Sequence, residues 1–377
     1  MSPARYRSDR FPPPGLDWSH LLPLIGRAQR AIAGYEGVLS GVPNPDILLS
    51  PLSAQEAVLS SRIEGTQSSL TEVLAVDVNG RGNGDTSPEH ADAREVLNYR
   101  RALMAATELM ADLPLSGRLI RHAHGVLMRG VRGGVADPGA YRRVQNWIGP
   151  PNSTEATATL VTCSAPEIGD AMGAWERYLH EDAPDELVQL GVVHAWFEAI
   201  HPFLDGNGRL GRLMVPLFLV AKGLLQRPNF YLSEYLERHR EDYYRYLLAA
   251  QSGADWPAWL RFFLIALEQQ AIANARKARQ ILALYAARKD WVATVTRSQH
   301  AVRSLDFMFH RPVFEASDLA AESDVPRATA RRILRVLRDQ KMLEELAPAQ
   351  GSRPAVLWFR ELIEIVERPS EFGDSPG

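Results

Sequence analysis

The stretch from His201 to Arg212 constrains this chain more than any other, because it places turn-forming and charged residues between two apolar segments. It reads His-Pro-Phe-Leu-Asp-Gly-Asn-Gly-Arg-Leu-Gly-Arg. Apolar residues recur at helical spacing before it, from 187 to 200, and after it, as far as 224. Pro202 lacks the backbone N–H that would continue the first helix. We therefore expect one helix to end at His201 and a second helix to begin where the glycines stop.

The turn between these two helices is predicted to bind an anion. Glycines at 206 and 208 can adopt positive φ, which lets successive backbone N–H groups point into one concavity. The N-terminus of the second helix also carries a partial positive charge that favours phosphate. Arg209 and Arg212 lie three residues apart on its first turn, and each guanidinium can bind phosphate oxygens through two hydrogen bonds. This combination predicts a triphosphate site.

Three further side chains of the stretch suit phosphate chemistry. Asp205 offers a hard carboxylate oxygen of the kind that binds Mg²⁺ while the ion keeps most of its waters. His201 can accept a proton near pH 7 and pass it on, so it is the candidate general base. Asn207 can donate to a phosphate oxygen without adding charge. The alternative, a structural histidine followed by an ordinary surface turn, does not account for both arginines.

The same stretch resembles the signature of the Fic family, His-Pro-Phe-x-Asp-Gly-Asn-Gly-Arg-x-x-Arg, at every specified position. The resemblance implies a small all-helical domain that transfers a nucleoside monophosphate, usually AMP from ATP, onto a hydroxyl side chain of a target protein. It also implies that His201 deprotonates the target hydroxyl and that Asp205 holds Mg²⁺. The loop would cradle the α-phosphate and the two arginines the β- and γ-phosphates. The implied nucleotide-binding residues are Gly206, Asn207, Gly208, Arg209, Leu210, Gly211 and Arg212.

A second motif lies far upstream. A helix is predicted from about 53 to 65, with Gly65 as its C-terminal cap. Taken alone, Glu64 is a carboxylate at a helix C-terminus, where the helix dipole disfavours negative charge. Ser60, Glu64 and Gly65 resemble the family's inhibitory motif, Ser/Thr-x-x-x-Glu-Gly/Asn. The resemblance implies that Glu64 pairs with Arg212, competes with the γ-phosphate and leaves bound ATP misplaced for attack.

Two other regions are expected beside this site. Residues 137–149 resemble the family segment that leads into a flap, and the β-branched residues of 157–162 predict a short hairpin after Pro150 and Pro151. Its edge could pair with an extended segment of the target, and the alternative is an ordinary surface loop. Five tyrosines between 229 and 248 predict an aromatic cluster, from which Tyr244 is expected to stack on adenine as family members use this region.

The last part of the chain has a different pattern. Helices are predicted at 298–309, 316–322 and 326–340, followed by strands at 342–346 and 355–359. This order is typical of a winged helix. Such units bind DNA in some proteins and dock or dimerise proteins in others, and the sequence leaves both open. The third helix carries a run of arginines that can meet phosphates, namely Arg327, Arg331, Arg332, Arg335 and Arg338.

Length and composition limit the alternatives. With 377 residues, of which 46% are hydrophobic, the chain can bury a large core in two or three units. A net charge of −3 favours neither nucleic acid nor membranes for the whole molecule, and no segment has the apolar length of a membrane span. A single cysteine, Cys163, excludes an internal disulfide. Since no signal peptide is recognised either, we expect a cytoplasmic protein.

We therefore expect a mainly α protein with a small β-hairpin flap. The predicted units are an N-terminal helical region (1–110), a Fic-type catalytic domain (111–270), a helical connector (271–295), a winged-helix domain (296–368) and a tail (369–377).

Two functional hypotheses compete. The first is a protein adenylyltransferase that uses ATP and Mg²⁺, modifies Ser, Thr or Tyr side chains of target proteins or itself, and is autoinhibited by Glu64. The second is a DNA-binding regulator whose Fic-like domain senses a nucleotide. The intact His201 and Asp205 favour the first, since a sensor has no need of a base. The oligomeric state, including a homodimer, stays open.

Overall fold

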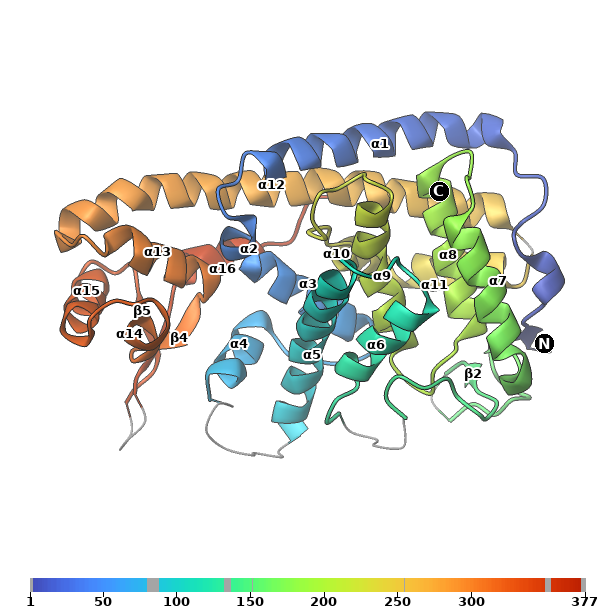
Figure 1. Ribbon diagram of the computed structural model, residues 1–377, viewed down its shortest axis with the longest axis horizontal. Coiled ribbons are helices and arrows are strands. Elements are labelled where there is room, and N and C mark those ends of the chain that lie inside the picture. The colour runs from blue at the N-terminus through green and yellow to red at the C-terminus, as the bar shows by residue number, and fades with distance from the viewer. Residues whose placement is uncertain are drawn as a thin grey trace.

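The computed structural model describes residues 3–79, 88–131, 137–150, 152–253, 255–349 and 354–373. Within these residues the chain is mainly helical and has two small three-stranded sheets, which confirms the predicted fold class. Figure 1 shows two long helices, α1 (Trp18–Ser40) and α12 (Trp256–Thr296), that run side by side along the long axis of the molecule. No described helix combines the length and the hydropathy that crossing a bilayer requires.

The pair α1 and α12 forms a spine for the other elements. α1 starts where the Asp17 carboxylate accepts a hydrogen bond from the Ser19 backbone N–H, at 3.0 Å, and so caps the first turn. The connector predicted at 271–295 is the second half of α12, which continues the first half without a break. The buried residues of α1 recur every three or four positions and form one stripe, namely Leu21, Ile25, Ala28, Ile32, Tyr35 and Leu39.

The helices that carry the site lie on one side of this spine (Figure 1). α8 (Glu186–Ile200) is buried along almost its whole length, and α9 (Asn207–Ala221) follows it after a short turn, as predicted. Around them lie α2 (Pro45–Leu48), α3 (Ser50–Ile63), α4 (Leu70–Asn79), α5 (Pro88–Leu109), α6 (Gly117–Leu127), α7 (Ile168–His180), α10 (Ser233–Arg238) and α11 (Arg240–Gln251).

The predicted hairpin is present as two short antiparallel strands, β2 (Trp147–Ile148) and β3 (Leu160–Val161). A third strand, β1 (Ala4–Arg5), pairs with β3 in parallel, so β2 is left as an edge strand. The sequence did not predict β1, because two residues are too short to produce a recognisable alternation. Pro151, which the hairpin prediction included, lies outside the described residues.

The C-terminal unit contains the three predicted helices and the two predicted strands. They are α13 (Ala301–His310), α14 (Asp318–Glu322), α15 (Arg327–Asp339), β5 (Glu344–Ala347) and β6 (Val356–Trp358). Two elements were not predicted, the strand β4 (Val313–Glu315) and the helix α16 (Arg360–Glu367). β6 lies between β4 and β5 and is antiparallel to both. The unit packs on the rest of the molecule through contacts of α13 with α2 and of α16 with α3.

The stripe on α1 yields a stability prediction. Ile32 is 2% exposed, and its truncation to alanine is expected to lower the free energy of unfolding by about 2–5 kcal/mol, because a cavity remains in the packed spine. Leu22 on the same helix is 61% exposed, so Leu22→Ala is expected to change that free energy by less than about 0.5 kcal/mol. Urea unfolding followed by circular dichroism measures both. Equal effects of the two substitutions would contradict the packing of α1.

Candidate active site

A cavity of about 590 Å³ lies where α3, α9, α11 and strand β2 meet. Its volume lies within the range of about 300–1,000 Å³ that is typical of small-molecule sites. Most of the residues singled out in the sequence line it: Glu64, His201, Asp205, Gly206, Asn207, Gly208, Arg209, Arg212 and Tyr244. The exceptions are Ser60, which is hydrogen-bonded to Arg212, and Leu210 and Gly211.

The turn between α8 and α9 is held by backbone geometry. His201 and Gly206 both have positive φ, 51° and 79°, which reverses the chain at each point. A Cβ atom on Gly206 would lie 2.9 Å from the Met128 sulfur, so glycine suits this position on two grounds. The first backbone hydrogen bond of α9 joins the Leu210 N–H to the Gly206 carbonyl. The N–H groups of residues 207–209 therefore precede the helical pattern and have no partner within the helix.

Asn207 differs from its sequence-based role. Its side-chain oxygen accepts a hydrogen bond from the Phe203 N–H and its amide donates to the Phe203 carbonyl, both at 2.9 Å. The side chain is buried and both of its polar groups are used. In this conformation Asn207 therefore braces the loop, and the group it offers to a phosphate is its backbone N–H.

Leu210 and Gly211, which the resemblance also implies as nucleotide-binding residues, are not among the residues that line the cavity. Leu210 is fully buried in the core, and a Cβ atom on Gly211 would overlap the Glu198 carboxyl group. Both residues are buried where α9 packs on the protein interior, Gly211 against Glu198 of α8. They shape the packing of α9 and do not line the cavity.

Arg212 is held by three acceptors from the end of α3. Its Nη2 atom lies 2.6 Å from Glu64 Oε1 and donates to the Ser60 carbonyl at 2.8 Å, while Nε donates to the Ser60 hydroxyl at 2.9 Å. The ion pair with Glu64 that the family resemblance implies is therefore present. The Arg212 side chain is only 1% exposed, so these partners, and not water, stabilise its positive charge.

The C-terminal cap of α3 fixes the place of Glu64. Gly65 has a φ of 106°, and its N–H bonds to the Arg62 carbonyl at 3.0 Å while the Thr66 N–H bonds to the Ser61 carbonyl at 3.3 Å. This hydrogen-bond pattern is the Schellman motif, and it ends the helix directly after Glu64. The Glu64 side chain, 36% exposed, then reaches across the cavity to α9.

Glu64 is ionised and covers the loop. Removal from bulk water raises the pKa of Glu64, but the charge and hydrogen bond of Arg212 outweigh this effect and hold the pKa below its ordinary value. A Cβ atom on Gly208 would overlap Glu64 Oε1. The carboxylate thus lies against the backbone at the start of α9, where an anion would otherwise meet the free N–H groups.

Arg209 has a partner that the sequence analysis missed. Its Nη1 atom lies 2.8 Å from Glu95 Oε2 on α5, and its Nη2 atom lies 3.5 Å from Asp205 Oδ1. Arg209 Nε is buried and has no hydrogen-bond partner among the described residues. No local signal marks Glu95, since it lies 114 residues from Arg209 in the chain.

His201 is neutral at physiological pH. Burial lowers its pKa to about 4. Its Nδ1 atom lies 3.2 Å from the Glu198 carbonyl oxygen, which can only accept a hydrogen bond. In the neutral ring Nδ1 therefore carries the proton, and Nε2 keeps the free lone pair of a base. Arg142 braces the same turn by donating from Nε to the His201 carbonyl at 2.8 Å.

The carboxyl group of Glu198 lies next to this imidazole, with Oε2 3.8 Å from Nδ1. Burial raises the pKa of Glu198 to about 8, so the group is mostly protonated at pH 7. Sequence reasoning did not single it out, because a glutamate in an apolar helix carries no motif of its own.

Tyr244 lines the wall of the cavity formed by α11. The residue is 39% exposed, its hydroxyl donates to the Ile63 carbonyl at 3.4 Å, and the Arg240 guanidinium lies 5.7 Å from the ring centre. Neighbouring Tyr243 is buried and bonds to His194 at 2.9 Å. Of these two tyrosines, Tyr244 is the one whose ring a planar ligand can reach.

Asp205 fits a magnesium ion that arrives with a nucleotide. Its side chain is 57% exposed at the mouth of the cavity, and Oδ1 accepts a hydrogen bond from the Gly206 N–H at 2.6 Å. Among the described residues, no three His, Cys, Asp or Glu side chains gather into a metal site. A lone exposed carboxylate suits Mg²⁺, which commonly takes one or two protein oxygens and completes its shell with water and phosphate.

Comparison with known proteins adds sequence relatives. A probable protein adenylyltransferase of Aquifex aeolicus is 37% identical over 79 residues, which are 21% of this chain and 22% of the Aquifex protein. The chain thus spans about a fifth of the length of this curated relative.

Solved structures share the fold. A Fic family protein from Desulfovibrio desulfuricans has a TM-score of 0.58 at 22% identity, over 93% of this chain and 98% of that chain. A Fic domain containing signaling protein from Bacteroides thetaiotaomicron has a TM-score of 0.53 at 15% identity, over 68% of this chain and 97% of that chain.

Two family models match the sequence itself, and together they cover about half of it. The model described as Fic/DOC family N-terminal matches residues 22–108, which include Glu64, and the model described as Fic/DOC family matches residues 114–219, which include the whole turn between α8 and α9. With both regions present in order and the matching fold around them, this chain belongs to the Fic/DOC family.

Proposed function

We propose that this chain is a protein adenylyltransferase, which transfers AMP from ATP to a hydroxyl side chain of target proteins. The observation that carries the proposal is the convergence of a neutral imidazole, a helix N-terminus and a buried guanidinium in one cavity. The first two groups suit an α-phosphate and its attacking hydroxyl, and the third suits a terminal phosphate. The Aquifex relative, named a probable protein adenylyltransferase, supports the choice of AMP.

ATP is proposed to lie along α9 with its phosphates on the loop. The N–H groups of residues 207–209 would bind the α- and β-phosphates, and Arg212 would bind the γ-phosphate through its planar fork. Arg209 would contribute its charge while Glu95 keeps it in place. Tyr244 offers a ring face on which adenine can stack.

In the proposed reaction His201 Nε2 accepts the proton of the target hydroxyl as that oxygen attacks the α-phosphorus. A new oxygen–phosphorus bond forms, and the bond between the α-phosphorus and the oxygen bridging to the β-phosphate breaks. Pyrophosphate leaves with that electron pair, so AMP remains on the target. Asp205 would hold Mg²⁺, which when bound supplies charge neutralisation on the phosphates. The edge strand β2 lies beside the cavity, where an extended target segment could pair with it.

The same geometry supports autoinhibition by Glu64. The carboxylate occupies the fork of Arg212 and lies against Gly208, so it holds the place proposed for the γ-phosphate and adds a like charge there. ATP can then bind productively only when Glu64 moves away or is removed. Since a minor state of this kind is typically populated at about 0.1–10%, the resting enzyme is expected to be slow.

Replacing Glu64 by glycine is expected to raise AMP transfer by at least about tenfold, because the competing carboxylate is gone. The assay incubates the protein and a cell lysate with ATP labelled at the α-phosphate and measures protein-bound label. Mass spectrometry of the labelled proteins identifies the adduct and the acceptor residue. The matched control is Glu181→Gly, which removes an exposed glutamate from the C-terminal end of α7 and should leave transfer unchanged.

A second substitution distinguishes the adenylyltransferase hypothesis from the hypothesis of a nucleotide-sensing regulator. Adding His201→Ala to the Glu64→Gly variant should reduce transfer by at least about 100-fold, since a general base contributes about 10²–10⁴. Silence of the Glu64→Gly variant itself, together with tight sequence-selective DNA binding, would instead favour the regulator hypothesis.

The role of Arg212 is tested in the absence of Glu64. The double variant Glu64→Gly/Arg212→Ala is expected to lose about 10- to 100-fold in transfer relative to Glu64→Gly, since a charged hydrogen bond contributes about 1.5–3 kcal/mol. Arg212→Lys in the same background keeps the charge and should lose less. Circular dichroism checks that both variants fold. Full activity of the alanine variant would refute binding of the γ-phosphate by Arg212.

The pH dependence of transfer reports the protonation of His201. Its pKa is lowered to about 4 by burial, so the base stays deprotonated and kcat/KM of the Glu64→Gly variant should be nearly flat from pH 7 to pH 5. Glu64 itself raises the pKa of His201, so its removal cannot shift the acid limb upward. NMR titration of the imidazole provides a second readout. An acid limb centred near the ordinary value of 6.5 would contradict the buried, neutral base.

A further inference from the structure

The helix α15 has two chemically distinct faces. Its apolar side chains, Ala330, Ile333, Leu334 and Leu337, are buried in the C-terminal unit. Its opposite face exposes three arginines spaced four residues apart, which we call the arginine row and which consists of Arg327, Arg331 and Arg335. The helix contains five arginines and one aspartate, whereas the whole chain has a net charge of −3. Positive charge is thus concentrated on this element.

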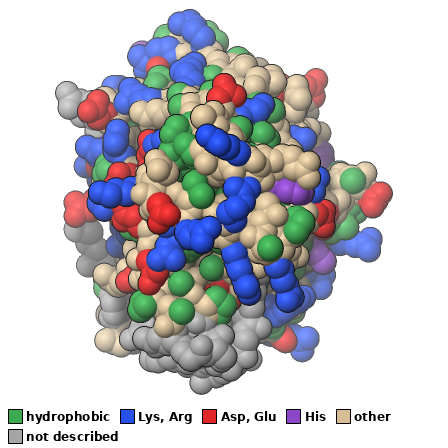
Figure 2. All heavy atoms as spheres, turned by 90° about the vertical axis from the view of Figure 1, so that its left-hand side faces the viewer, with side chains coloured by type: hydrophobic (Ala, Val, Ile, Leu, Met, Phe, Trp, Pro, Cys, Tyr) green, Lys and Arg blue, Asp and Glu red, His purple; other side chains and the backbone are tan. Residues whose placement is uncertain are grey.

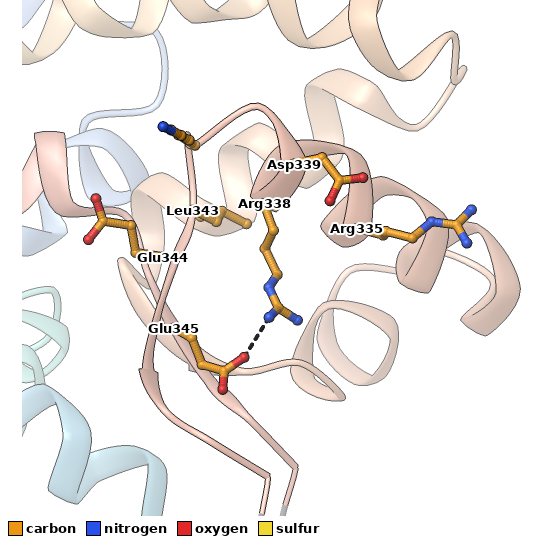
Figure 3. Close-up of a pocket in the computed structure, with 7 residues that line it drawn as sticks. Arg335, Arg338, Asp339, Leu343, Glu344 and Glu345 are labelled. Carbon is orange, nitrogen blue, oxygen red and sulfur yellow. Dashed lines mark hydrogen bonds and ion pairs between the residues drawn. The ribbon is translucent and has the colours of Figure 1, made fainter.

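The arginine row is available for a partner. Two other arginines of α15 are already used: Arg332 donates to the Thr296 carbonyl at 2.6 Å, and Arg338 pairs with Glu345 at 2.5 Å. Within the described part of the chain, no carboxylate forms an ion pair with any member of the row. Figure 3 shows the Arg335 side chain directed away from the Arg338–Glu345 pair. The three guanidinium groups are therefore exposed and form no ion pair among the described residues.

We propose that the arginine row binds double-stranded DNA, with the N-terminal part of α15 in the major groove and β5 and β6 beside it as a wing. The row spans eight residues, or about 12 Å at 1.5 Å per residue. The major groove, about 12 Å wide, admits an α-helix, and arginines that follow one another along one face of that helix can each reach a phosphate at the groove's edge. The recognition helices of helix-turn-helix proteins lie in the major groove with their N-terminal residues at the base edges.

The position of the unit is compatible with a long, rigid partner. In Figure 1 α15 lies at one end of the molecule, beyond the helices that carry the cavity. Figure 2, which views this end directly, shows Lys and Arg side chains gathered across its centre. Acidic residues are found beside the C-terminal end of α15, where Asp339, Glu344 and Glu345 line a shallow hollow together with Arg335 and Arg338. Arg327 and Arg331, in the N-terminal part of the helix, do not line this hollow. The N-terminal part of the helix is therefore the part that suits phosphate.

An acidic protein is the less favoured partner. Protein interfaces depend on buried aromatic or aliphatic anchors that are surrounded by a polar rim. None of the large exposed hydrophobic side chains found among the described residues lies on α15. A regular set of unpaired charges without an apolar anchor matches phosphate backbone contacts, which are electrostatic and depend on salt.

The experiment measures binding of a fluorescein-labelled 20-base-pair duplex of arbitrary sequence to the full chain by anisotropy, from 50 to 200 mM salt. The double variant Arg331→Ala/Arg335→Ala should weaken binding at least about tenfold at 100 mM salt and reduce the slope of log K against log salt by about 2. Both residues are exposed, and circular dichroism checks the fold. The matched control is Arg30→Ala/Arg261→Ala, which removes two exposed arginines elsewhere and should bind like the wild type.

Three outcomes would overturn the proposal. The wild type could fail to bind the duplex at 50 mM salt, the double variant could bind as tightly as the control, or polyglutamate could bind the row more tightly than the duplex, which would assign it to an acidic protein. AMP transfer by the Glu64→Gly variant is measured separately with and without Arg331→Ala/Arg335→Ala. If the Arg331→Ala/Arg335→Ala substitutions abolish DNA binding and leave AMP transfer unchanged, the DNA-binding proposal is supported separately from the proposed enzyme activity.

Discussion

The buried charge of Arg212 is the constraint on which the site depends. A guanidinium that is 1% exposed requires an anion close by, since water cannot solvate it. The end of α3 meets this requirement with Glu64 and with two oxygen atoms of Ser60. A nucleotide that reaches the same guanidinium must replace the carboxylate. Under the proposed function, the inhibitory carboxylate and the γ-phosphate compete for this one buried charge, which Glu64 neutralises in this structure.

The helix that provides this carboxylate is also fixed at its other end. The Ser50 hydroxyl, in the first turn of α3, donates to the His310 carbonyl of the C-terminal unit at 3.0 Å and accepts from Arg100 at the same distance. α3 further contacts α5, α9, α10 and α16. α3 thus packs against the helices around the cavity and also against the C-terminal unit. Because the body of α3 is held in this way, Glu64 can move most easily at the C-terminal cap, after the last helical turn.

Sequence reasoning reached the parts of the site that are encoded locally. Pro202 and the glycines at 206 and 208 mark the turn, and the β-branched residues of 157–162 mark the hairpin. The spacing of Ser60 and Glu64 marks the motif that meets Arg212. Contacts that arise from tertiary packing left no such mark. Glu95 reaches Arg209 across 114 residues, the Asn207 amide is taken up by Phe203, and Leu210 and Gly211 turn inward because a helix shows only one face to a cavity. A sequence motif thus identifies a segment that forms part of the site. Which of its residues line the cavity and which are buried in the core depends on the direction of each side chain.

The missing side chain of Gly208 has a consequence for how this protein can change. Any larger residue there would collide with Glu64 and would also obstruct the backbone that phosphate must approach. Under the proposed function, a substitution at this position would displace the Glu64 carboxylate and would also obstruct the phosphate site. Under the proposed function, a change that removes the Glu64 carboxylate and spares the phosphate site therefore has to lie at the end of α3 and not in the glycine-lined loop.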